Sequence, residues 1–389
     1  MILLLRYCHT HFFVALLWAL LAGASVTVPA AAAEPLLDAS LRCTQALKQR
    51  DLAAARAACS QAAALATTPA PGRAVGPPQR LEALYRWGDL LLAMNQPGEA
   101  EPVFRQAFAL SESAFGRASL ESALALEKLG MALLRANQAQ QASAVFVQSL
   151  EIRQSRAGAT SLLVADSLHA LGLSAMELRE PLLAEERFRR ALAIRQQLLA
   201  NNHPLLGRTL NNVAVAVEAA HGAAAALPLY ESALALLQVA VGPDDLSLTD
   251  TVESLARALT TLQRPEDAER FWRRALAIRE AKQGREHIDT ATVLNELGVL
   301  YATTRRFAAA DEVLRRALVI RQNAFGINDL QVAEVTNNLG TLMILQGRLA
   351  EAYPLLQHSA SVTYVALGSG HTITQNRWAN LLRALPARR

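Results

Sequence analysis

The sequence predicts an all-α fold made of tandem helical hairpins, and two observations carry that prediction. Hydrophobic residues make up 52% of the 389-residue chain and are mostly alanine and leucine, whereas aromatic residues make up only 5%. Alanine and leucine favour helices and give little strand tendency. The chain also repeats itself with a period of 42 residues, which indicates an array that grows by stacking units and not by enlarging one core.

Five columns of residues recur in phase every 42 positions over seven units. The small helix-A column is Gly88, Gly130, Gly172, Ala214, Ala256, Gly298 and Gly340. The alanine column is Ala100, Ala142, Ala184, Ala226, Ala268, Ala310 and Ala352. The large apolar column is Phe104, Phe146, Phe188, Tyr230, Trp272, Leu314 and Leu356. The small helix-B column is Ala107, Ser149, Ala191, Ala233, Ala275, Ala317 and Ser359. The loop glycine column is Gly116, Gly158, Gly242, Gly284, Gly326 and Gly368, with Ala200 as the exception.

Residues 1–33 predict a signal peptide for export. Arg6 precedes an apolar stretch over 12–22, and three alanines up to Ala33 offer a cleavage site after that residue. The alternative is an uncleaved membrane anchor, because no charge occurs over residues 12–33. We therefore expect a periplasmic or secreted protein, attached to the membrane and facing the periplasm only if the signal is retained. No later stretch is expected to be long and apolar enough to span a membrane.

Residues 34–66 predict a degenerate N-terminal hairpin, with helices over 36–49 and 51–66. Cys43 lies about as far before the turn near Arg50 as Cys59 lies after it, so an antiparallel pair brings the two to the same height. Export supplies an oxidising compartment, and we expect a disulfide between them. The alternative is two small buried thiols. Residues 67–79 are rich in proline and glycine and predict a linker.

Residues 80–371 predict seven 42-residue repeats, each a pair of helices A and B. In the unit 288–329, helix A is expected over 288–304 and helix B over 307–323. We expect the small residue on A to face the small residue on B, so that the two axes approach closely. Pro97, Pro181 and Pro265 mark first positions of helix B, where a missing N–H costs nothing. Residues 372–389 predict a capping helix and tail, with Leu382 where a small residue would otherwise recur.

Several motifs of the repeat resemble one known family. They are Asn337-Asn338-Leu339-Gly340, Gln346-Gly347-Arg348, Glu351-Ala352, the loop glycine before a His or Asp, and the column Pro102, Pro228 and Pro354 inside helix B. Over residues 80–385 the chain resembles tetratricopeptide repeats of the kinesin light chain class. The resemblance implies a TPR-type α-solenoid, a right-handed superhelix of helical hairpins. The coiled-coil heptads of that family are absent, so motor association is not implied.

The resemblance also implies a concave groove lined by helix A that holds an extended peptide or a partner helix. In that family, helix-A asparagines bond the ligand's backbone, and the matching positions are Asn211, Asn212, Asn295, Asn337 and Asn338. Other helix-A residues assigned to this groove are Tyr85, Asp89, Glu127, His169, Arg208, Glu253 and Arg257.

The groove side of helix A carries many more acids than bases. The acids are Glu82, Asp89, Glu127, Asp166, Glu218, Asp250, Glu253 and Glu334, against only Arg208 and Arg257. This predicts a negative groove. The alternative is that acids near helix N-termini offset the helix dipole.

The remaining charged and histidine-bearing patterns do not point to chemistry. Five helix-B arginines follow an acid by four residues (Glu185–Arg189, Glu186–Arg190, Glu269–Arg273, Asp311–Arg315 and Glu312–Arg316), and Arg274 lies beside them, which favours a paired, solvated face over nucleic-acid binding. His203, His287 and His371 share one column with Asp245 and Asp329, one residue per repeat, so helix capping is favoured over a metal site. No phosphate loop, nucleophile motif or metalloprotease motif is present.

The sequence therefore predicts a protein–protein interaction adaptor or scaffold. We expect a protein or peptide ligand and no catalysis, cofactor, metal, nucleic acid or small-molecule substrate. The net charge of +4 is too balanced to argue for nucleic acid. The alternative function is a membrane-anchored structural assembly factor of the cell envelope.

Overall fold

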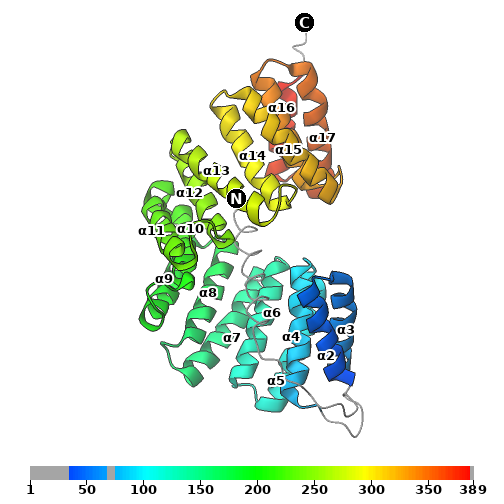
Figure 1. Ribbon diagram of the computed structural model, residues 1–389, viewed down its shortest axis with the longest axis vertical. Coiled ribbons are helices and arrows are strands. Elements are labelled where there is room, and N and C mark those ends of the chain that lie inside the picture. The colour runs from blue at the N-terminus through cyan, green and yellow to red at the C-terminus, as the bar shows by residue number, and fades with distance from the viewer. Residues whose placement is uncertain (1–34, 68–74, 386–389) are drawn as a thin grey trace. The chain divides into compact units, whose positions relative to one another are not determined.

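The computed structural model describes residues 35–67 and 75–385, and within these ranges all of the regular structure is helical (Figure 1). The predicted signal peptide lies outside the described residues. The helices are α2 (Pro35–Gln49), α3 (Leu52–Thr67), α4 (Pro77–Ala93), α5 (Pro97–Phe115), α6 (Leu120–Arg135), α7 (Ala139–Ala157), α8 (Leu162–Glu177), α9 (Pro181–Leu198), α10 (Pro204–His221), α11 (Ala223–Val241), the short 3-10 turn η2 (Leu246–Leu248), α12 (Thr249–Thr261), α13 (Pro265–Lys282), α14 (Ile288–Thr303), α15 (Phe307–Phe325), α16 (Leu330–Leu345), α17 (Leu349–Leu367) and α18 (Thr372–Arg383).

The chain divides into two compact units, Met1–Ala220 and His221–Arg389. Within each unit, consecutive helices pack side by side as hairpins, α2 against α3 and α6 against α7 in the first, α14 against α15 and α16 against α17 in the second. The all-α solenoid prediction is confirmed. The division after Ala220 was not predicted, because the 42-residue pattern continues across it.

In five of the repeats, a glycine of helix A leaves a notch that accepts a large side chain from helix B. A Cβ added to Gly298 would lie 2.4 Å from Cγ of Leu314, and one added to Gly130 would lie 2.4 Å from the ring of Phe146. The same contact joins Gly88 to Phe104, Gly172 to Phe188 and Gly340 to Leu356. The expectation that small residues face each other is therefore wrong: the glycine faces the large column, because the large side chain needs the space.

The small residues of helix B lie against the backbone of helix A instead. The Oγ of Ser149 donates to the carbonyl of Ala123 at 2.9 Å, and the Oγ of Ser359 donates to the carbonyl of Ala333 at 2.6 Å. Only a small side chain leaves room for this approach of helix B to a helix-A backbone.

The turns and caps follow the repeat. Gly116, Gly326 and Gly368 end their helices with φ of +88°, +80° and +79°, a region that favours glycine. His287 and His371 each accept a hydrogen bond from the backbone N–H two residues on. His203, Asp245 and Asp329 cap in the same way. Helix capping is thereby confirmed for this column.

Two boundaries differ from the prediction by two residues or more. Helix α4 begins at Pro77, inside the range assigned to the linker, because a proline is well placed at the first position of a helix. Helix α15 continues to Phe325, two residues beyond the expected end.

Helix α11 is the one helix among the described residues that is long and apolar enough to cross a membrane, by length and composition alone. The expectation that no later stretch meets this test is wrong. Its Ala226, Tyr230 and Ala233 are buried residues of the repeat columns, and α11 packs against α12. Helix α11 is therefore a packed helix of the solenoid.

Candidate partner-binding face

The helix-A face is the side of α4, α6, α8 and α10 in the first unit, and of α12, α14, α16 and α18 in the second, that carries the predicted groove residues. In the second unit its asparagines bond from one repeat to the next. The Nδ2 of Asn338 donates to Oδ1 of Asn295 at 2.9 Å, and the Nδ2 of Asn380 donates to Oδ1 of Asn337 at the same distance. Both bonds join positions 43 residues apart, so they form a ladder along α14, α16 and α18.

The ladder divides the predicted asparagines into two classes. Asn211, Asn295 and Asn337 are buried, at 4%, 1% and 5% exposure, whereas Asn212 and Asn338 are half-buried. The prediction that all five lie open to a ligand's backbone is therefore wrong for the first class. The first asparagine of each pair is turned between adjacent helices, and only the second reaches the surface.

The first unit has a similar inter-repeat row made of different side chains. An imidazole nitrogen of His169, Nε2, lies 3.2 Å from Nδ2 of Asn212. The Nζ of Lys128 donates to both carboxylate oxygens of Asp89 at 2.7 and 2.8 Å and lies 5.5 Å from the ring centre of Tyr85. Burial raises the pKa of the Tyr85 hydroxyl well above its usual value. These residues hold α4 to α6 and α8 to α10.

A further column, which the sequence analysis missed, supplies the basic partners of helix A. Arg153, Arg195, Arg279 and Arg321 are separated by multiples of 42 residues, lie near the ends of B helices, and are at most 3% exposed. We call them the arginine clamps. The signal was available in the same 42-residue pattern, but an arginine column suggests a solvated face unless its burial is known.

Each arginine clamp joins two successive A helices. In the second unit, Arg279 donates to Glu253 of α12 at 2.6 Å and to Asp289 of α14 at 3.0 Å. Arg321 reaches Glu334 of α16 at 2.8 Å and Thr292 of α14 at 3.4 Å.

In the first unit, Arg195 bonds Asp166 of α8 at 2.7 Å and Thr209 of α10 at 2.6 Å. Arg153 pairs with Glu127 of α6 and donates to Ser167 of α8 at 3.0 Å. Burial raises the pKa of Glu127 although Arg153 opposes that shift.

The clamps change the charge of the helix-A face. Seven of the acids counted there form these ion pairs: Glu82–Arg86, Asp89–Lys128, Glu127–Arg153, Asp166–Arg195, Asp250–Arg279, Glu253–Arg279 and Glu334–Arg321. The prediction of a negative groove is wrong, because five of these acids pair with arginines of helix B and the other two pair with Arg86 and Lys128 of helix A.

Three charged residues of this face have few or no side-chain hydrogen bonds or ion pairs among the described residues. Glu296 of α14 and Arg208 of α10 are half-buried and form no side-chain hydrogen bond or ion pair within the described residues. Arg257 donates only to Ser254, at 3.2 Å. Burial raises the pKa of Glu296 to about 7, and Glu334 and Glu253 act in the same direction, against Arg257 and Arg321. Sequence reasoning did not single out Glu296.

The helix-B face carries the predicted pairs. Arg189–Glu185, Arg190–Glu186, Arg273–Glu269 and Arg315–Asp311 are four residues apart and in contact. Arg316 differs: it pairs with Glu280 of the preceding B helix at 2.6 Å and not with Glu312.

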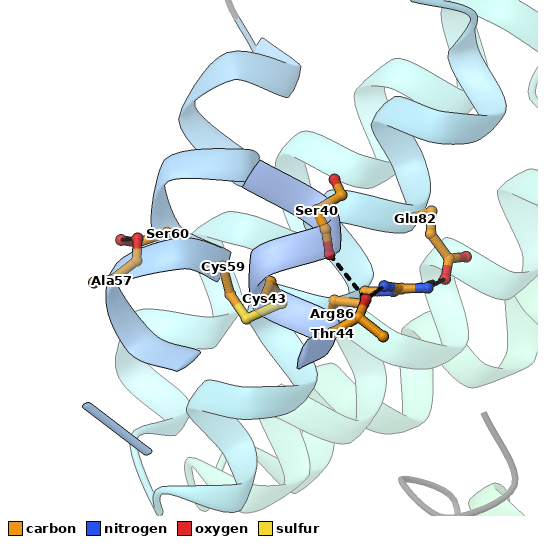
Figure 2. Close-up of a disulfide and its surroundings, with 8 residues drawn as sticks. All are labelled: Ser40, Cys43, Thr44, Ala57, Cys59, Ser60, Glu82 and Arg86. Atoms are coloured by element: carbon orange, nitrogen blue, oxygen red, sulfur yellow. Dashed lines mark hydrogen bonds and ion pairs between the residues drawn. A yellow bond between two sulfur atoms is a disulfide. The ribbon is translucent and has the colours of Figure 1, made fainter. Parts of the chain in front are cut away.

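At the N-terminal hairpin, Cys43 and Cys59 are joined by a disulfide between α2 and α3 (Figure 2). On the neighbouring surface Arg86 of α4 donates to the hydroxyl of Thr44 and pairs with Glu82 (Figure 2). The hairpin is thus tied to the first repeat. Within the described residues no group of three or more His, Cys, Asp or Glu side chains is placed to hold a metal ion.

Comparison with known proteins gives one family and several similar folds. The model of the tetratricopeptide repeat matches residues 79–155, 163–238 and 248–323. No curated protein sequence matches the chain.

Three solved structures illustrate the likeness. The apo form of the quorum sensor NprR from B. thuringiensis is 14% identical, with a TM-score of 0.63 over 84% of this chain and 87% of that one. A Rap protein complexed with Competence and Sporulation Factor is 13% identical, with a TM-score of 0.53 over 90% and 98%. A putative kinesin light chain from Podosopora anserina is 20% identical, with a TM-score of 0.46 over 54% and 99%.

At these identities the likeness to NprR and to the Rap protein shows the fold alone. The three segments that match the repeat model span more than half of the sequence, and they coincide with the hairpins α4–α7, α8–α11 and α12–α15. The chain belongs to the tetratricopeptide repeat family.

Proposed function

We propose that this protein is a non-catalytic adaptor that binds a partner protein or peptide on its helix-A face. The observation that carries the proposal is the set of half-buried polar residues that the helix-A face carries in each unit, Arg208 and Asn212 in the first and Glu296 and Asn338 in the second. The inter-repeat ladder and the arginine clamps hold these residues in place before a ligand arrives, and such preorganisation lowers the entropy lost on binding. Their amide and charged groups are suited to a peptide backbone and to charged side chains.

The similar folds support the same function. The Rap protein was solved complexed with Competence and Sporulation Factor, and NprR is a quorum sensor. A tetratricopeptide array of this kind is typically a binding scaffold, which supports the absence of catalysis in the proposal. The partner of the present chain is not implied by either neighbour.

The test uses half-buried positions of the helix-A face whose side chains form no hydrogen bond or ion pair within the described residues. The mature protein is used to capture its partner from the native envelope, with Arg208→Gln and Glu296→Gln as test variants. Arg189→Gln, which breaks an exposed pair on the helix-B face, is the matched control. We expect at least about a tenfold loss of partner affinity, or about 1.4 kcal/mol, in one or both test variants and none in the control. Equal binding by all the variants would exclude the helix-A face.

For location, we propose a periplasmic or secreted protein cut after Ala33. The Cys43–Cys59 disulfide supports this, because such bonds persist in oxidising compartments. Two measurements test it: the mass of the mature N-terminus, and thiol labelling of denatured protein purified without reductant. A retained N-terminus would favour the membrane-anchored assembly factor instead. Free labelling of both cysteines would remove the support from the disulfide.

A further inference from the structure

A cavity of about 330 Å³ opens between α7, α8 and α9, on the helix-B side of the first unit and away from the helix-A face. Its apolar wall is formed by Val147 and Leu150 of α7, Leu171 of α8 and Leu183 of α9. Four charged side chains also line it: Glu151 of α7, Glu180 before α9, and Arg187 and Arg190 of α9. The volume lies at the lower end of the range for ligand sites, so it suits a small molecule.

The cavity exists because one repeat departs from the pattern of the others. Helices α5, α9, α13 and α15 carry an acid and an arginine four residues apart that contact each other across this surface: Glu101–Arg105, Glu185–Arg189, Glu269–Arg273 and Asp311–Arg315. At the matching positions α7 carries the smaller Ser143 and Val147. Helices α11 and α17 also lack the pair, but they place the larger Leu227 and Tyr353 at the first of the two positions.

Arg190 is also held differently from its counterparts in later repeats. Arg316 reaches back to Glu280 of the preceding B helix at 2.6 Å and to the carbonyl of Arg285 at 2.8 Å. Arg274 likewise donates to the carbonyl of Pro243 at 2.7 Å. The residue that corresponds to Glu280 in the repeat before Arg190 is Gln154, which lines the cavity and forms no bond with Arg190.

The charges of the cavity are not satisfied by one another. Arg187 and Arg190 share a single exposed carboxylate, Glu186, at 3.8 and 3.6 Å. Glu151 and Glu180 form no side-chain hydrogen bond or ion pair within the described residues. By the 42-residue register, Glu151 lies one helical turn beyond the level of Arg190, since position 148 on α7 matches Arg190 on α9. The exposed side chains of Glu151 and Arg190 therefore lie near the same end of the cavity and form no ion pair with each other.

We propose that this cavity binds a free aliphatic α-amino acid. The ligand's carboxylate accepts hydrogen bonds from the guanidinium groups of Arg187 and Arg190. Its ammonium group donates to the carboxylate of Glu151, and its side chain contacts Val147, Leu150, Leu171 and Leu183. A zwitterion has no net charge, and it suits a lining in which the charges of two acids and two bases sum to zero. A ligand with only a negative charge would be attracted by the two arginines but repelled by the carboxylate of Glu151.

The test is calorimetric titration of the mature protein with L-leucine and two analogues that each lack one charged group, 4-methylpentanoate and 3-methylbutan-1-amine. We expect saturable binding of L-leucine with a dissociation constant of about 1 mM or lower, and at least about tenfold weaker binding of either analogue. No saturable binding of L-leucine up to about 10 mM would overturn the proposal. Equal binding of 4-methylpentanoate would overturn the role of Glu151 and with it the choice of an amino acid.

Variants locate the binding. Ser143→Glu combined with Val147→Arg rebuilds the pair found on α9 and fills the cavity, so L-leucine binding should be lost while the melting temperature stays close to that of the wild type. Arg190→Gln should weaken binding at least about tenfold, and Arg189→Gln on the same helix should not. Unchanged binding in the filled variant would place the ligand elsewhere and overturn the proposal. Because Arg208→Gln and Glu296→Gln lie on the other face, they should leave L-leucine binding unchanged, which separates this test from that of the partner.

Discussion

A residue in this array takes its role from what its neighbouring helices place beside it. Gly298 and Gly130 are small because Leu314 and Phe146 occupy the space of their missing side chains. Asn295 and Asn338 lie on neighbouring A helices of the same face, yet the first is buried as an acceptor and the second is half-exposed as its donor. The type of residue alone does not distinguish a ligand contact from an inter-repeat bond.

The first prediction concerns the glycine notch. Gly298→Ala places a Cβ 2.4 Å from Cγ of Leu314, so the hairpin must open, at a cost of about 1–3 kcal/mol in the free energy of unfolding. Urea denaturation measures the loss. Leu314→Ala removes the clash as well as packing, so the double variant should be less destabilised than the sum of the two single variants. Strict additivity would show that Gly298 and Leu314 do not meet.

The second prediction concerns Glu296 and pH. Burial raises its pKa from 4.5 to about 7, so between these values the folded chain holds a proton that the unfolded chain has released. The unfolded state binds fewer protons in this window, and the free energy of unfolding therefore falls as pH rises from about 4.5 to about 7.

Glu296→Gln removes this titration and keeps the shape of the side chain. The variant should be more stable than the wild type at pH 8, on the order of 1–3 kcal/mol, and nearly equal to it at pH 4. Comparing the two proteins at each pH separates Glu296 from Glu127 and Glu253, whose pKa values burial also raises. A constant difference across the pH range would contradict the shift.

At the scale of the helices, the B helices do more than cover the A helices. Each arginine clamp starts on a B helix and bonds the A helices on both sides of it, as Arg279 does with Glu253 and Asp289. Consecutive repeats are thus joined by buried, charge-assisted hydrogen bonds as well as by apolar packing. The same column holds Ser111, Leu237 and Thr363 in the first, fourth and last repeats, where the clamp is absent.

The third prediction compares two arginines of helix α13. Arg279→Ala leaves the carboxylate of Glu253 buried without its partner and should cost about 3–5 kcal/mol. Arg273 lies six positions earlier on the same helix and pairs with Glu269 at the surface, where its side chain is 61% exposed. Arg273→Ala should cost less than about 1 kcal/mol. Similar losses for both variants would mean that the clamp contributes no more than a surface pair.

The sequence was enough to predict the helices, their pairing into hairpins and the caps, because each leaves a local signal repeated every 42 residues. His287 shows this: its place before an A helix and its column with Asp329 predicted a cap, and it accepts the expected bond. The predicted groove fared less well, since the direction of a side chain depends on the rotation of packed helices. Asn337 and Glu296 look alike as helix-A polar residues, but only Asn337 bonds the next repeat.

At the scale of the whole chain, the sequence was enough to predict the disulfide but not the division into two units. Two cysteines at equal distances from a turn are visible in the sequence, and the structure joins Cys43 to Cys59. The division between Ala220 and His221 depends on how densely residues far apart in sequence contact one another. The alanine column and the large apolar column continue across it, so the 42-residue period itself gives no sign of it.

The last prediction tests whether the two units respond separately to damage. In repeat arrays each repeat contacts mainly its neighbours, so destabilisation spreads along the chain only as far as neighbouring contacts carry it. Arg279→Ala removes a clamp within the second unit, and the corresponding Arg153→Ala removes one within the first. Hydrogen exchange measured by mass spectrometry should show faster exchange in α12–α14 for the former and in α6–α8 for the latter. Each variant should leave the other unit at the rate of the wild type. If Arg153→Ala accelerated exchange equally in α14 and α16, the chain would open as one cooperative body, and the division after Ala220 would have no energetic meaning.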